Sequence, residues 1–497
     1  MGARKRASAD LQRSATRPAL PSSIIFFLIL ADSGLVALAM DPGASGAPSA
    51  ATAAAGARAA PSAAAGAPPP AAPPPGAAAA RRERVAAAVS QLRELTSDVL
   101  GFWLDHGPDP MHGGFHATLE RGGAPGSPTD KGIVQQARHC WALSKAAAAP
   151  GAPPPGGAGR AEAGARAAWE FINARMRRPD GLCAWLVSRD GATVVDPGPS
   201  LYGQFFYIYA AVEFAQAFGD REALAAALAA FRATESAFYD GARGGYDESS
   251  SRPRLHALRL PGGGAPRTLN VFLHGIESLT ALFEATGDGA VLARLAEMTG
   301  ILTARLITAD DVLYEFYDPA MWAPVGPPSV NFGHNLETAW VASAASRALS
   351  RAGRLSAPAA AAAAARLAAV AARALREGYD SERGGVYEAG VPGAPPGAGE
   401  GASTLKVWWV QAEALLAASD ALRATGDDAY LGYIEGILKF VREHIRDAAD
   451  GEWVWQTDAA GRVAGPRGRQ KGNKWKASYH NVRCLLLLQE WLGPLAA

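Results

Sequence analysis

The sequence predicts an all-α fold, an (α/α)6 barrel of six helical hairpins with short β-hairpins at one end. Two observations carry this prediction. Apolar-periodic helical segments recur along the chain. Six short segments of glycine or polar residues followed by aromatic or branched ones lie between them, with last residues roughly 60–72 apart. Helix pairs that repeat at a nearly constant period are typical of a repeat architecture, and six pairs can close on themselves.

The expected helices form two sets. Those before each β-hairpin span 83–103, 160–176, 221–238, 288–305, 358–378 and 428–447. Those after it span 130–148, 200–218, 268–285, 334–353, 404–425 and 478–493. A small β-hairpin or an extended turn is expected at each of 112–115, 181–185, 244–246, 312–314, 384–386 and 452–454, and the segment at 312–314 fits the pattern least well. The all-alanine run 359–365 supports the helical assignment, because alanine has the best helix propensity.

The first 80 residues are not expected to belong to the barrel. Residues 1–40 combine a basic region with a short apolar stretch, which is typical of a secretory or organelle targeting segment. The alternative is a cytoplasmic protein that starts at Met40. Residues 41–80 are almost entirely Ala, Gly, Pro and Ser, which cannot bury enough apolar surface to fold, so we expect a disordered linker. The barrel domain is expected over 81–497.

Charge and cysteine usage narrow the classes of partner. The formal net charge is +1 and basic residues gather only at the extreme N-terminus, so nucleic acid is not expected as a partner. The N-terminal apolar stretch is shorter than the ~20 residues of a spanning helix, so no membrane association beyond targeting is expected. The cysteines lack CxxC spacing, and Cys140 and Cys484 are expected in the core. A monomer or homodimer is expected.

The helices after the β-hairpins carry unusual polar and aromatic residues near their starts, namely Arg138, Tyr202, His274, His334, Trp408 with Trp409, and His480. If these helices form the inner ring, their side chains converge at one end and make a small-molecule pocket. Histidine suits proton transfer near neutral pH. One histidine beside an apolar stripe is more often a core residue, whereas three at equivalent positions indicate chemistry.

Two histidines have a glutamate three residues later, His334 with Glu337 and His274 with Glu277. Each pair shares a helical face, so the carboxylate can orient the imidazole. Such pairs can also bind metal, as in di-iron bundles, but those sites need glutamates from two further helices. Because no four-ligand set is visible, we expect no metal.

Other residues at the helix starts suit a sugar. Arg138 can polarise a substrate oxygen or form a structural salt bridge. The flat faces of Trp408, Trp409 and Trp475 suit the C–H faces of sugar rings, or pack in the core instead. Glu413, one turn after Trp409, offers acceptors for hydroxyls.

Several stretches resemble the N-acylglucosamine 2-epimerase / cellobiose 2-epimerase superfamily, in order and across nearly all of 85–495. They are Asp130–Trp141, Gly333–Glu337, Trp408–Glu413 and Trp475–Asn481, with Phe102-Trp103, Gly113–Phe115 and Tyr202–Gln204. The third and fourth stretches resemble cellobiose-type members more closely, although Asn335 and Ala477-Ser478 depart from their pattern. The resemblance implies an (α/α)6 barrel and cofactor-independent epimerisation at C2 of a reducing-end aldose. Glucose/mannose-type sugars, N-acylglucosamine/N-acylmannosamine and cellobiose are the candidate substrates.

The resemblance also implies roles for individual residues. His334 and His480 are expected to act as two bases on opposite faces of C2, through a cis-enediol(ate). Arg138 and His274 are expected to handle the C1 oxygen and ring opening. The residues expected to position the sugar are Tyr202, Asn270, Glu337, Trp409, Glu413 and Trp475.

Three other functions stay open on the same scaffold. An aldose–ketose isomerase of the mannose isomerase type would use the same proton transfer. A glycoside hydrolase needs two carboxylates flanking the scissile bond, whereas the helix starts are dominated by His, Arg and Trp. A non-catalytic sugar-binding or interaction protein cannot be distinguished from an enzyme by its fold alone.

Overall fold

The computed structural model describes residues 76–149, 155–248, 251, 258, 260 and 265–496. The expected targeting segment and all of the expected linker up to residue 75 lie outside these residues. Helix α1 (Ala77–His106) includes the last four residues of the expected linker, which are helical rather than disordered. These four residues are all alanine, and they continue into a helix anchored on another part of the barrel. Arg81 lies 2.9 Å from Asp428, and Arg84 makes two hydrogen bonds to Glu435.

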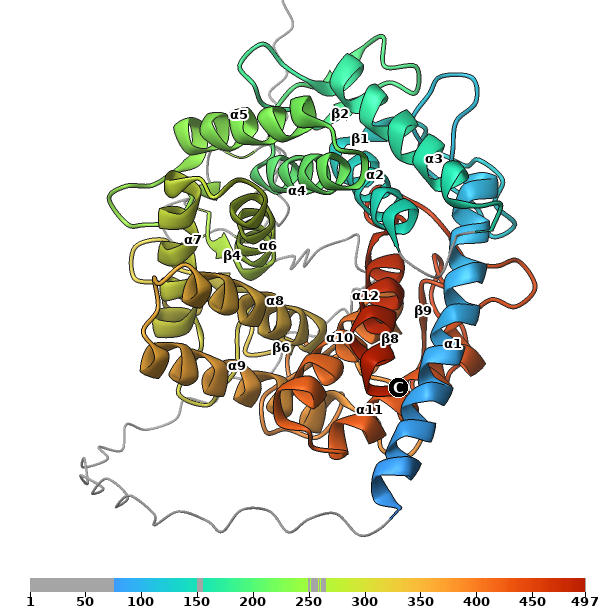
Figure 1. Ribbon diagram of the computed structural model, residues 1–497, viewed down its shortest axis with the longest axis vertical. Coiled ribbons are helices and arrows are strands. Elements are labelled where there is room, and N and C mark those ends of the chain that lie inside the picture. The colour runs from blue at the N-terminus through green and yellow to red at the C-terminus, as the bar shows by residue number, and fades with distance from the viewer. Residues whose placement is uncertain are drawn as a thin grey trace, which may run out of the picture.

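Two concentric rings of helices form the barrel (Figure 1). The inner ring consists of α2 (Ile133–Ala148), α4 (Leu201–Phe218), α6 (Leu269–Thr286), α8 (Phe332–Arg351), α10 (Trp408–Thr425) and α12 (Tyr479–Ala496). The outer ring consists of α1, α3 (Ala158–Phe171), α5 (Arg221–Phe238), α7 (Gly289–Ile301), α9 (Ala357–Gly378) and α11 (Ala429–Phe440). Three outer helices continue into a π-helical turn, at Ile172–Met176, Leu302–Leu306 and Val441–Ile445. All twelve predicted helices are present, so the predicted fold class is confirmed.

The inner ring is closed. Each inner helix packs against the next one, and α12 packs against α2. Each inner helix also packs closely against the outer helix that follows it in the chain, and α1 packs against α12. The first helix of the barrel therefore completes the last pair, and this contact ties the two ends of the domain together.

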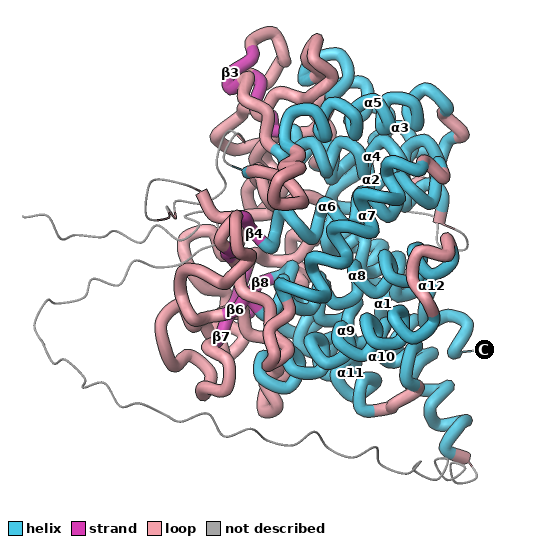
Figure 2. Tube along the Cα trace, turned by 90° about the vertical axis from the view of Figure 1, so that its left-hand side faces the viewer, coloured by secondary structure: helices cyan, strands magenta, loops and turns pink. Residues whose placement is uncertain are grey.

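Short antiparallel strands gather at one end of the barrel (Figure 2). β1 (Lys131–Gly132) pairs with β2 (Leu186–Val187), and β2 pairs with β3 (Val194–Asp196). The other pairs are β4 (Arg267–Thr268) with β5 (Phe316–Tyr317), β6 (Val330–Asn331) with β7 (Ala389–Gly390), and β8 (Lys406–Val407) with β9 (Gln456–Thr457). Because β1, β4, β6 and β8 each run directly into an inner helix, four inner helices are seen to start at this end.

The predicted β-hairpins lie before the inner helices. Five are closed by β-bridges, at 108 with 115, 177 with 183, 239 with 246, 379 with 386 and 446 with 453. At the sixth, the N–H of Thr308 donates to the carbonyl of Val312 at 3.0 Å, and Asp311 has a φ of 56°. This segment is a tight turn, not a bridged hairpin.

A side-chain amide near the start of four inner helices fixes the hairpin before it. Gln204 accepts from the N–H of Cys183 at 2.8 Å and donates to its carbonyl at 3.1 Å. The same pair of hydrogen bonds joins Gln136 to Phe115, Asn335 to Leu313 and Gln411 to Val386. Asn335, a departure from the cellobiose-type pattern, therefore has a structural partner.

A buried cation clamps each of four hairpin turns. Lys406, fully buried, donates to Asp380 at 2.8 Å and to the carbonyl of Gly384 at 2.7 Å. Gly384 has a φ of 75°, a conformation that favours glycine. The equivalent clamps join Lys131 to Asp109, Arg267 to Asp240 and Lys471 to Asp447. These charges are buried but paired, as buried charges must be.

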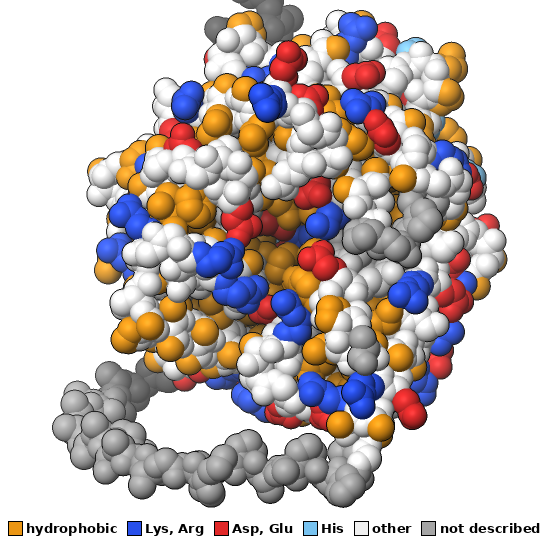
Figure 3. Space-filling model, viewed as in Figure 1, with side chains coloured by type: hydrophobic (Ala, Val, Ile, Leu, Met, Phe, Trp, Pro, Cys, Tyr) orange, Lys and Arg blue, Asp and Glu red, His pale blue; other side chains and the backbone are white. Residues whose placement is uncertain are grey.

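Acidic and basic side chains are interspersed on the face shown in Figure 3, around a central hollow. Among the described residues, α9 is the one helix with the length and apolarity of a membrane span. Its apolar character comes largely from alanine, and it packs against α8. Cys140 and Cys484 are fully buried, which confirms their predicted place in the core.

Candidate active site

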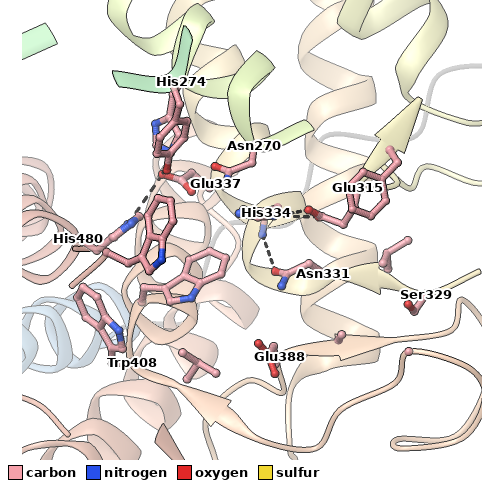
Figure 4. Close-up of a pocket in the computed structure, with 18 of the residues that line it drawn as sticks. Asn270, His274, Glu315, Ser329, Asn331, His334, Glu337, Glu388, Trp408 and His480 are labelled. Carbon is pink, nitrogen blue, oxygen red and sulfur yellow. Dashed lines mark hydrogen bonds and ion pairs between the residues drawn. The ribbon is translucent and has the colours of Figure 1, made fainter. Parts of the chain in front are cut away.

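A cavity of about 160 Å³ lies where the inner helices begin (Figure 4). That volume is about ten times the space needed for one water molecule. Nine of the ten predicted site residues line it, namely Arg138, Tyr202, Asn270, His274, His334, Glu337, Trp409, Trp475 and His480. The cavity therefore brings together side chains from all six inner helices.

His274 is held by the glutamate that its spacing predicted. Its Nδ1 lies 2.8 Å from Oε2 of Glu277, and the hydroxyl of Tyr479 donates to the same oxygen at 2.7 Å. Burial lowers the pKa of His274. A neutral imidazole here donates from Nδ1 to the carboxylate and keeps a lone pair on Nε2.

His334 has a different partner from the predicted one. Its Nδ1 lies 2.9 Å from both carboxylate oxygens of Glu315, whereas Glu337 accepts from Arg483 at 2.6 Å. His334 lies in the first turn of α8, so its Nδ1 can turn toward the residue just before β5 while Glu337 points to the barrel axis. Burial alone would lower the pKa of His334, but the charge and hydrogen bonds of Glu315 outweigh it and raise the pKa.

His480 is held by Glu413, which was expected to bind sugar hydroxyls. Its Nδ1 lies 2.7 Å from Oε1 of Glu413, and Oε2 of Glu413 accepts from the indole of Trp340 at 3.0 Å. Glu413 is fully buried and is not among the described residues that line the cavity. It therefore lies behind His480, not against a ligand. Burial, with the charges of Arg138 and Arg483, lowers the pKa of His480 well below its usual value.

A buried arginine that sequence reasoning missed joins these carboxylates. Arg483 is fully buried and donates to Glu337 at 2.6 Å, to Glu413 at 2.7 Å and also to Glu277. Its position three residues after His480 places it on the same helical face, and this spacing could have identified it from the sequence.

The guanidinium of Arg483 bears on the metal alternative. Glu337, Glu413 and His480 bring ligand atoms within 4.8 Å of one another, as a bound ion would need. Arg483 donates to one oxygen of each of these two glutamates. A protein cation therefore already compensates the charge that would attract a metal ion.

Arg138 contacts neutral oxygen atoms. It donates to the hydroxyl of Tyr202 at 2.9 Å and to the backbone carbonyl of Trp475. Its guanidinium carbon lies 4.5 Å from the centre of the Phe206 ring. With neutral partners, Arg138 keeps a positive charge at the cavity wall for a substrate oxygen.

Several buried polar atoms of the wall have no hydrogen-bond partner within the described part of the chain. They are Oδ1 of Asn270, Oε2 of Glu337 and the indole nitrogens of Trp408, Trp455 and Trp475. Buried polar groups are normally paired, so a cluster of unpaired ones around a cavity indicates a ligand rich in hydroxyls. Trp409 supplies a flat face between two of the histidines, with ring centres 4.8 Å from His334 and 5.6 Å from His480.

Two carboxylates that were not predicted, Glu315 and Glu388, also line the cavity. Burial raises the pKa of Glu388 to about 7, and its side chain accepts from the hydroxyl of Ser403 at 3.0 Å. Both follow the hairpin segments, where the sequence offered no helical spacing to mark them.

The model of the family described as N-acylglucosamine 2-epimerase (GlcNAc 2-epimerase) matches residues 113–484. The chain belongs to the N-acylglucosamine 2-epimerase family. This confirms the predicted family and the enzyme class, an isomerase of the carbohydrate epimerase type.

Three family members illustrate the match. Cellobiose 2-epimerase of Bacteroides fragilis is 29% identical over 403 residues, covering 80% of this chain and 97% of the relative. N-acylglucosamine 2-epimerase of Mus musculus is 25% identical, covering 80% and 90%. The structure of cellobiose 2-epimerase from Spirochaeta thermophila superimposes with a TM-score of 0.71 at 28% identity, covering 86% of this chain and all of the other.

Proposed function

We propose that this family member is a sugar 2-epimerase that acts at C2 of a reducing-end aldose of the glucose/mannose type. One observation carries the proposal. Three histidines line one cavity, and each has its Nδ1 at 2.7–2.9 Å from a carboxylate. A carboxylate on Nδ1 sets the ring orientation and, in the neutral ring, leaves Nε2 free for proton transfer.

The proposed reaction moves one proton off C2 and one proton back. In the ring-opened sugar, His480 takes the proton from C2, and the C–H electrons move into the C1–C2 bond while the carbonyl electrons move to the C1 oxygen. His334 then returns a proton to the opposite face of the cis-enediolate. The lowered pKa of His480 suits a base, and the raised pKa of His334 suits an acid. The reverse reaction exchanges the two roles.

The negative charge that develops at the C1 oxygen needs stabilisation. Arg138, Tyr202 and His274 are close together, since Arg138 bonds to Tyr202 at 2.9 Å and the rings of Tyr202 and His274 lie 5.3 Å apart. We assign the C1 oxygen to this side, with Asn270 and Trp475 beside it. The inner helices also begin at the cavity, and helix N-termini favour negative charge.

We infer that the substrate extends beyond one ring. The wall continues past the histidines to small and apolar residues, which are Phe316, Pro327, Ser329, Ala389 and Gly401. Together with the likeness to cellobiose 2-epimerases, this favours a disaccharide with a reducing-end glucose, such as cellobiose, over a single N-acylated sugar.

Incubation in D2O with cellobiose, N-acetylglucosamine and mannose tests the proposal. We expect cellobiose to yield its C2 epimer, with deuterium at C2 in both sugars by NMR. Turnover of N-acetylglucosamine alone would correct the substrate class, and ketose as the main product would indicate an aldose–ketose isomerase. Cleaved cellobiose would point to hydrolysis by Glu315 and Glu388. No reaction with any sugar would leave a binding protein.

A further inference from the structure

The nitrogen of His480 that carries the proton depends on the charge of Glu413. If Glu413 is ionised, Nδ1–H of His480 donates to Oε1 at 2.7 Å, and Nε2 keeps a lone pair. If Glu413 is protonated, its hydroxyl donates to Nδ1 instead, and a neutral imidazole then carries its proton on Nε2. In that tautomer His480 cannot take a proton through Nε2.

Burial works against the ionised form of Glu413. Its side chain is fully buried, and burial raises its pKa to about 8, with a further contribution from the Glu337 carboxylate. The opposing effects come first from the charge of Arg483, and then from hydrogen bonds donated by Arg483 and Trp340. Arg483 therefore decides how much of Glu413 is ionised at the pH of the reaction.

We propose that Arg483 is a positioning residue that favours the ionised form of Glu413 and thereby the His480 tautomer whose Nε2 serves as the base. The inference rests on the proposed role of His480 in proton transfer. Arg483 donates to Oε1 of Glu413 at 2.7 Å, the same oxygen that His480 contacts. Because Arg483 is not among the described residues lining the cavity, it acts through Glu413 and not on the sugar.

Titratable and charged groups from several helices surround Glu413 and His480. The titratable groups near Glu413 and His480 are Arg483, Tyr479 and Cys484 on α12, Glu337 (3.9 Å from His480) and His334 on α8, Arg138 on α2 and His274 on α6. Arg138 disfavours a charged His480 but does not bond to Glu413. Among the described residues, Arg483 is the cation bonded to the tautomer-setting carboxylate.

His334 provides an internal control. Its Nδ1 bonds to Glu315, and Arg483 bonds to Glu277, Glu337 and Glu413. A change at Arg483 should therefore alter the tautomer of His480 and leave that of His334 unchanged.

The full chain and its variants Arg483→Gln and Arg483→Lys are each labelled with 15N-histidine. Two-bond 1H–15N spectra of these proteins then distinguish protonated from bare ring nitrogens. His480→Asn and His334→Asn assign the signals. In the unaltered protein at pH 9 we expect His480 with a protonated Nδ1 and a bare Nε2. In Arg483→Gln at that pH we expect Nε2 to carry the proton, with Arg483→Lys between the two. A protonated Nε2 in the unaltered protein, or an unchanged His480 in folded Arg483→Gln, would overturn the proposal.

The pH dependence of kcat/KM gives a second readout that a merely structural role would not move. Activity should rise as Glu413 ionises through about pH 8. Removing a cation at hydrogen-bond distance should move this rise upward by about 1–3 pH units. Activity lost equally at every pH in a variant with native circular dichroism would contradict the proposal. Should Arg483→Gln not fold, the spectra of the unaltered protein and Arg483→Lys decide. The tautomers are measured without sugar, so a failure of the proposed epimerisation remains distinguishable.

Discussion

Glu315 holds His334 from outside the inner ring of helices, with both carboxylate oxygens 2.9 Å from its Nδ1. Glu315 immediately precedes β5, and β5 pairs with β4, the strand that leads into α6. His480 and His274, in contrast, are held by glutamates of inner helices. A loop carboxylate thus stabilises the protonated form of His334, the proposed acid, whereas a glutamate of an inner helix holds His480, the proposed base.

Replacing Glu315 with glutamine should remove the charge that raises the pKa of His334. His334 must be protonated to act as the acid, so a lower pKa shifts the alkaline loss of activity to lower pH. We expect kcat/KM at pH 7.5 to fall about 10²-fold, within the range of general acid–base catalysis. Measurement of kcat/KM from pH 5 to 10, with NMR titration of His334, checks this. A folded variant with an unshifted pH profile would show that Glu315 does not set the charge of His334.

Removal of divalent ions should leave the activity unchanged. Arg483 donates to the two glutamates that could otherwise join His480 in holding a metal ion. We expect less than a twofold change in kcat/KM after exhaustive treatment with EDTA and gel filtration. Loss of activity that a divalent ion restores would mean that the enzyme needs a metal.

Gln204→Ala should destabilise the barrel by leaving the N–H and carbonyl of Cys183 unpaired in the core. Each unpaired buried group costs about 1–3 kcal/mol, so we expect the loss of both bonds to lower the free energy of unfolding by about 2–6 kcal/mol. Urea denaturation followed by circular dichroism measures it. Gln216→Ala, an exposed change on the same helix, is the matched control and should have little effect.

Lys406→Met should leave the carboxylate of Asp380 buried without its cation, at a cost of about 3–5 kcal/mol near pH 7. Although burial acts to raise it, the bond from Lys406 and other hydrogen bonds lower the pKa of Asp380. The ion pair therefore contributes above the usual aspartate pKa, and its contribution fades as the pH falls through the lowered value. We expect the two proteins to differ most at pH 7 and to converge below about pH 4. The same difference at pH 3 and pH 7 would contradict this account, and the exposed Lys439→Met serves as the control.

The helices and the general place of the site were predictable because both depend on local patterns. Apolar periodicity marked the helices, and His274, His334 and His480 all lie near the starts of inner helices. The orientation of the side chains was harder to predict from the sequence. Glu337 and Glu413 were expected beside the imidazole and the sugar, yet both accept from Arg483 at the axis.

The missed residues depend on contacts between distant segments. Glu315 reaches His334 across 19 residues of chain that no helical spacing relates. Arg483 had a local signal, but its role depends on three glutamates from three other helices. From the sequence alone, an arginine in an apolar run is expected to be a surface residue or to form a salt bridge. Its contacts with the three glutamates can be seen only when the other helices are in place.

One-sided hydrogen exchange shows whether His334 and His480 act on opposite faces of C2. His334→Asn and His480→Asn are each incubated in D2O with cellobiose and, separately, with its C2 epimer, after circular dichroism shows a native fold. We predict that each variant loses net epimerisation by at least about 10²-fold. The base left in place should still exchange the C2 hydrogen of one epimer, and the two variants should label different epimers. Near-native turnover in both folded variants, or the same epimer labelled by both, would contradict the two-base account.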